Sequence, residues 1–149
     1  MKSFLTMKYH FKANEKEKKL LKFLCHISKN IYNCALYELR GQYFKEKKKC
    51  THFDLNMIIS KNINYHILYA YQSLCTIRIA HANMEKFVSH HNEDGSLKKT
   101  TIKINNKKDC TKLPKYKKKK ALMLLVTDQI RVVEYQNKKI FEITFIEFN

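Results

Sequence analysis

The sequence predicts an α+β fold in which a small β-barrel is interrupted by a bundle of three helices. The hydrophobic period carries this prediction. Apolar and polar residues alternate over residues 4–12, apolar residues then recur at steps of three and four up to about residue 90, and alternation returns after a turn at residues 92–95. Alternation is typical of strands, and the longer step is typical of helices. A strand, three helices and further strands are most economically joined as a barrel whose first strand comes from the N-terminus.

Three segments are expected within the 149 residues, a length that suits one domain or two small ones. Residues 1–12 form the first barrel strand. Residues 13–92 form the helical lobe. Residues 98–149 form the remaining barrel strands and contain a basic segment at 112–120.

The longest predicted helix begins at Asn14, a favoured N-cap residue, with Glu15 and Glu17 in the first turn, where the helix dipole favours acids. A second helix is expected at about residues 53–62 and a third at about residues 65–90. Each has an apolar face. The positions expected to face the core are Leu20, Leu24, Ile27, Ile31, Ala35 and Leu39, then Leu55, Ile58 and Ile59, and then Ile67, Ala70, Leu74, Ile77, Met84, Phe87 and Val88.

Short strands are expected on either side of the basic segment, where the apolar period is two. They span residues 101–104, 122–127, 130–135 and 139–148. In the barrel, Leu113 is expected to anchor the basic segment as its apolar residue.

The charge distribution favours a polyanionic partner. The formal net charge is +17, and residues 98–120 hold 11 lysines against the single acid Asp109. Such a block attracts nucleic acid by releasing condensed counterions. The competing interpretations are a solvated lysine-rich surface and the codon bias of an AT-rich genome.

Several other classes are disfavoured by what the sequence lacks. The five cysteines include no Cys-x-x-Cys pair, and the N-terminus has no long apolar run typical of a secretory signal. No apolar stretch approaches the length of about 20 residues that a membrane helix needs, so no membrane partner is expected. We therefore expect a cytoplasmic, nucleoid-associated protein.

The acidic residues do not predict a catalytic centre. Asp54, Asp94, Asp109 and Asp128 all fall where turns or helix starts are expected, whereas metal-assisted phosphodiester hydrolysis needs several carboxylates together. His90, His91 and Cys110 have no known metal-site spacing, and two glycines cannot make a phosphate loop. We expect neither an enzyme nor a bound metal or cofactor.

The candidate binding residues are basic and aromatic. Three of them, Lys8, His10 and Lys12, share one face of the first strand. The basic segment adds Lys112, Lys115, Lys117, Lys118, Lys119 and Lys120 for phosphates, and Tyr116 to stack on an exposed base. The alternatives are a solvated strand face and, for Tyr116, a packed barrel residue. Tyr32, Tyr37 and Tyr43 on the first helix are expected to be mostly core or helix–helix contacts.

Four segments together resemble the N-terminal part of the TnpB (OrfB) proteins of insertion sequences. The carriers are Met7-Lys8-Tyr9-His10-Phe11, Ile31-Tyr32-Asn33-Cys34-Ala35-Leu36, Ile77-Arg78 followed by Ala82-Asn83-Met84-Glu85-Lys86-Phe87, and Leu113-Pro114-Lys115-Tyr116-Lys117-Lys118-Lys119. They occur in the family's order, and the resemblance covers nearly the whole chain.

The resemblance implies a wedge-type barrel interrupted by a helical recognition lobe, in a protein that binds a guide-type RNA and target DNA. It adds Asn33 and Arg78 as nucleic-acid-binding positions. In the family, a RuvC nuclease domain and a zinc-binding insert follow the barrel. We expect this chain to lack both, as a truncated or split half whose nuclease partner is missing.

Two alternatives stay open. One is a stand-alone helix-turn-helix DNA regulator, which would dimerise on a palindrome; the sequence offers no short glycine turn between two compact helices. The other is an inert transposase remnant with no selected role.

Overall fold

The computed structural model describes residues 13–68, 70–92, 96, 98 and 112–118, and the backbone of residues 130–135 and 138–143. The strands expected at residues 1–12, 101–104 and 122–127 lie outside these described residues. So do five candidate binding residues: Lys8, His10, Lys12, Lys119 and Lys120.

Helix α1 spans Glu15–Gly41 and begins where the sequence predicts. Asn14 accepts a hydrogen bond from the backbone N–H of Glu17, while the Glu17 carboxylate accepts one from the backbone N–H of Asn14, at 2.9 and 2.7 Å. This capping box satisfies two N–H groups that the helix itself cannot pair. A π-helical turn, η1 (Gln42–Glu46), continues the helix, and Lys47, with φ of 55°, ends it.

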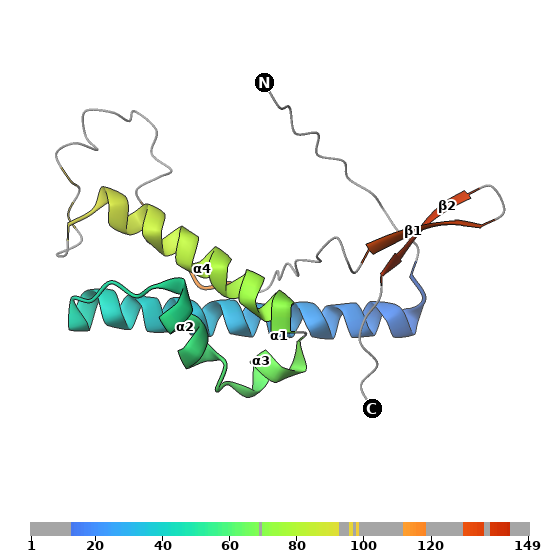
Figure 1. Cartoon of the computed structure of the whole chain (residues 1–149), viewed down its shortest axis with the longest axis horizontal. Coiled ribbons are helices and arrows are strands. Elements are labelled where there is room, and N and C mark those ends of the chain that lie inside the picture. Colours follow the sequence, from blue (N-terminus) through green and yellow to red (C-terminus); the bar gives the residue numbers. More distant parts are fainter. Residues whose placement is uncertain are drawn as a thin grey trace, which may run out of the picture.

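The core of the described residues lies between α1 and α4 (Ala70–His90), which runs along α1 in Figure 1. From α1, Ile31, Ala35 and Leu36 are fully buried, and from α4 Ile77 and Ala80 are. A buried hydrogen bond of 3.2 Å joins the hydroxyls of Ser28 and Thr76 across the two helices. The periodicity therefore identified the facing stripes of both helices correctly.

Two short helices lie beside this pair. Helix α2 spans His52–Ile59 and begins with a capping box at Thr51 and Asp54. Helix α3 spans Ile63–Ile67 and is capped by Asn62. The prediction of a single third helix from about residue 65 was wrong. The backbone of Leu68 is extended and separates α3 from α4.

Some expected core positions are exposed. Leu20 is 41% exposed on α1, Ile58 is 38% exposed on α2, and Ala70 is exposed at the start of α4. Tyr37 is 62% exposed, whereas Tyr32 and Tyr43 are buried as expected. These exceptions arise because periodicity places a residue on a helix face without telling how far the covering helix reaches.

The predicted fold class is wrong: the described residues form a helical bundle and no barrel. Strands β1 (Ile130–Tyr135) and β2 (Lys138–Ile143) form an antiparallel hairpin in which Val132 pairs with Phe141. Within the part of the chain that the structure describes, they make a sheet of two strands. The physical reason is that alternating residues predict strands but not their partners, so the same pattern is compatible with a barrel and with a hairpin. Among the described helices, none is both long and apolar enough to cross a membrane.

Candidate nucleic-acid interface

The segment 112–118 lies along α1, held there by Asn33. The side-chain Nδ2 of Asn33 donates to the carbonyl of Lys117 at 3.0 Å, and its Oδ1 accepts from the backbone N–H of Lys117 at 2.8 Å. This pair of bonds matches both polar groups of one peptide residue, as a neighbouring strand would. In the structure the Asn33 amide holds the basic segment, and nucleic-acid binding by Asn33 stays a prediction.

Arg40 holds the other end of the segment. Its Nη2 donates to the carbonyl of Pro114, and its guanidinium carbon lies 4.4 Å from the centroid of the Tyr116 ring. A guanidinium over a tyrosine face at this distance is a favourable cation–π contact. The sequence interpretation missed Arg40, although Asn33, Tyr37 and Arg40 follow one another at helical steps of four and three.

These contacts fix the direction of the segment. Pro114 lies at Arg40 and Lys117 lies at Asn33, so the segment runs antiparallel to α1. Seven helical residues rise about 10 Å, and three extended residues span about the same length. From Pro114 to Lys117 the segment therefore runs towards the N-terminal half of α1. On the same face, that half carries Lys22, His26 and Lys29.

Two further contacts join the segment to the bundle. The Nζ of Lys117 lies 4.3 Å from the centroid of the Tyr32 ring, and the Tyr32 hydroxyl accepts a hydrogen bond of 3.2 Å from Asn83 on α4. Leu113 is partly buried against the helical core. Leu113 thus anchors the segment, but to the helical bundle rather than to a barrel.

The remaining lysines of the segment face solvent. Lys112, Lys115 and Lys118 are exposed, and neither of the ion pairs found among the described residues involves them. Arg78, the other predicted contact, is exposed on α4, and no described contact joins it to the segment. The structure therefore gathers Asn33, Tyr116 and the lysines of 112–118 at one place and leaves Arg78 outside that group.

A hollow of about 520 Å³ opens beside Tyr116, between α1 and α2. We call it the tyrosine groove; its lining residues are Asn33, Cys34, Tyr37, Glu38, Ile58, Ile59, Lys61, Asn62 and Tyr116. Burial, followed by the nearby charge of Glu38, raises the pKa of the Cys34 thiol, while a hydrogen bond from Asn62 lowers it.

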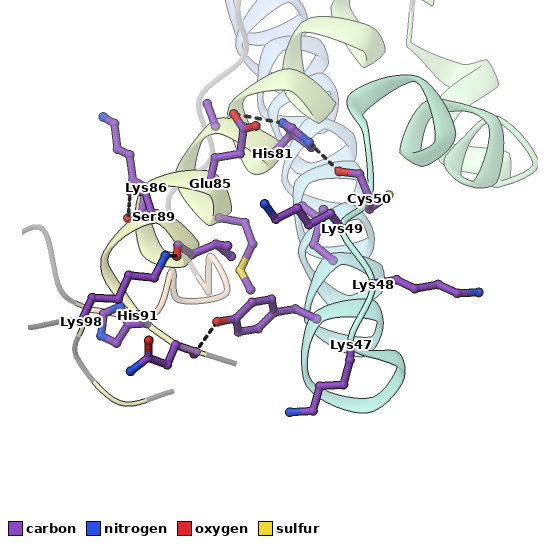
Figure 2. A pocket seen from close by; sticks show the side chains of 16 residues that line it. Lys47, Lys48, Lys49, Cys50, His81, Glu85, Lys86, Ser89, His91 and Lys98 are labelled. Carbon is purple, nitrogen blue, oxygen red and sulfur yellow. Dashed lines mark hydrogen bonds and ion pairs between the residues drawn. The ribbon is translucent and has the colours of Figure 1, made fainter. Parts of the chain in front are cut away.

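A second hollow, of about 830 Å³, lies near the C-terminal ends of η1 and α4 (Figure 2). Several lysines surround it, but the ends of helices carry unpaired carbonyls that favour cations. Lys98 donates from Nζ to the carbonyl of Val88 at 3.1 Å, and His81 bonds to the carbonyl of Cys50 at 2.8 Å. Figure 2 shows Lys48 and Lys86 pointing away from the hollow. The bond from Lys98 satisfies a carbonyl in the last turn of α4.

The described residues contain no group of three or more histidine, cysteine, aspartate or glutamate side chains that could hold a metal ion. The ring of His91 stacks on Phe87 with centroids 3.9 Å apart, and its Nδ1 bonds to the Phe87 carbonyl.

In comparisons with known proteins, no family model, curated protein or solved structure matches the chain.

Replacing Asn33 with alanine should release the segment locally. Two hydrogen bonds worth about 0.5–1.5 kcal/mol each are lost, so the backbone N–H of Lys117 should exchange with solvent roughly 5- to 150-fold faster. Amide hydrogen exchange followed by NMR measures this. In Lys117→Ala, which keeps the backbone groups that Asn33 binds, exchange at position 117 should stay slow. Equal exchange in Asn33→Ala and the wild type would mean that Asn33 does not hold the segment.

Proposed function

We propose that this chain is a nucleic-acid-binding module whose phosphate-binding surface is the segment 112–118 together with the polar face of α1. One observation carries the proposal: the segment is held by its backbone and by Asn33 and Arg40, so that Lys112, Lys115 and Lys118 stay exposed. A fixed row of solvated cations matches a phosphate backbone.

Electrostatics supports the same proposal. The segment runs towards a helix half that already carries Lys22 and Lys29. Like charges brought together oppose the compact state unless a counterion or polyanion neutralises them. A bound nucleic acid supplies that neutralisation along the whole row.

The resemblance to TnpB-type proteins predicts which nucleic acids bind: a guide-type RNA and DNA. The identity of these nucleic acids stays a prediction, and the barrel that the resemblance also implied is no longer part of it. The proposal concerns binding and assigns no cleavage to this chain. A single-stranded RNA is the first probe, because its backbone can follow an extended segment.

The proposal is tested by titrating a fluorescein-labelled 20-nucleotide RNA with the protein and following anisotropy between 50 and 200 mM salt. Three phosphates neutralised by Lys112, Lys115 and Lys118 contribute about −2 to the slope of log affinity against log salt. We expect a slope at least this steep. No binding at 50 mM salt, or binding indifferent to salt, would refute the proposal. A stable dimer that prefers a palindromic duplex would favour the regulator instead.

A further inference from the structure

Exposed apolar side chains line the tyrosine groove. Tyr37 is 62% exposed, Tyr116 is 39% exposed and Ile58 is 38% exposed, and all three line this one hollow. They come from α1, from the basic segment and from α2. An exposed apolar group assembled from three separate segments marks a binding surface more often than scattered exposed residues do.

We propose that the tyrosine groove holds one unpaired nucleobase of a strand whose phosphates contact the basic segment. This inference rests on the proposed function and adds to it the chemistry by which a single strand is distinguished from a duplex. A paired base cannot enter, because it remains stacked within its helix.

The composition of the groove suits a base. Two tyrosine rings offer flat aromatic surfaces, and base–aromatic stacking is the general means by which proteins bind single strands. Arg40 covers one face of the Tyr116 ring at 4.4 Å. This contact restrains the ring, so that less side-chain entropy is lost when a base stacks on it. The volume of about 520 Å³ lies in the range of small-ligand pockets.

The charges around the groove also suit a nucleotide. Lys61 lines the groove, and Lys115 precedes Tyr116 in the chain, so each can supply a cation for a flanking phosphate. Glu38 is the acid in the lining, and its carboxylate can accept hydrogen bonds from an exocyclic amino group. Adenine, cytosine and guanine all carry such a group, and adenine is used as the base of the probe.

The test compares two RNA strands of equal charge: a 12-nucleotide oligoadenylate and an abasic strand of the same length. For Tyr37→Ala, affinity for oligoadenylate should fall by roughly 5- to 150-fold, the loss of one stacked base. Its salt slope should stay unchanged, as should its affinity for the abasic strand. Tyr37→Phe keeps the ring and should restore binding to within about twofold.

Tyr71→Ala is the matched control, because Tyr71 is 47% exposed on α4 and does not line the groove. If Tyr37→Ala and Tyr71→Ala bind oligoadenylate equally, or if the wild type binds both strands equally, the base site is refuted and the phosphate surface stands. If the wild type binds neither strand, the proposed function itself fails. Circular dichroism establishes that each variant keeps its helices.

Discussion

Ile77→Ala is expected to lower the free energy of unfolding by about 2–5 kcal/mol. The Ile77 side chain is fully buried on α4 in the core shared with α1, so its removal loses both apolar burial and the contacts around the resulting cavity. For a domain of ordinary stability this is a large fraction of the total. Urea denaturation followed by circular dichroism measures it.

Its neighbour Arg78 provides the control. Arg78 is exposed on the same helix, so Arg78→Ala should change the free energy of unfolding by no more than about 0.5 kcal/mol. A loss below about 1 kcal/mol for Ile77→Ala would contradict the packing of α4 on α1.

Local features of the sequence predicted the helices well. The start of α1 depends on Asn14 and Glu17, three residues apart. Asn14 is the expected N-cap, and the Glu17 carboxylate completes a capping box. The buried stripes of α1 and α4 follow from steps of three and four. Such signals are complete within one turn of helix, so a sequence alone contains them.

The barrel failed because it depended on pairings between distant strands. The apolar alternation at residues 130–135 does correspond to β1, but its partner is β2. The segment 112–118 lies on a helix, through Asn33 and Arg40, which are 84 and 74 residues from their partners. Nothing in the local pattern specifies contacts across such distances.

The candidate site was likewise predicted only in part. Composition alone singled out the lysines and Tyr116. Asn33 was chosen through a resemblance, and its contact with Lys117 gives it a structural role. Arg40 and the exposure of Tyr37 were missed, because their significance depends on where the segment lies. In the sequence, Arg40 is only a polar residue and Tyr37 only an aromatic residue on one face of a helix.

Changing Lys112, Lys115 and Lys118 together to glutamine should weaken binding of a single-stranded RNA roughly 100-fold at 0.1 M salt. The estimate assigns one phosphate to each lysine. Each neutralised phosphate contributes about 0.7 to the magnitude of the slope of log affinity against log salt. The fold should survive, because Asn33 binds the segment through the backbone of Lys117 and Arg40 binds it through the carbonyl of Pro114.

A control variant must remove the same charge elsewhere. Lys48, Lys49 and Lys86 are exposed and line the second hollow, so their triple change to glutamine lowers the net charge equally. If attraction came from net charge alone, both triple variants would lose the same affinity. The proposed surface predicts a much smaller loss for the control.

The slope of log affinity against log salt, measured by anisotropy for the wild type and both triple variants, tests the phosphate-binding surface most directly. The variant of Lys112, Lys115 and Lys118 should have a slope shallower by about 2, and the variant of Lys48, Lys49 and Lys86 a slope close to that of the wild type. Equal slopes in the two triple variants would contradict the assignment of the phosphate-binding surface to the segment 112–118.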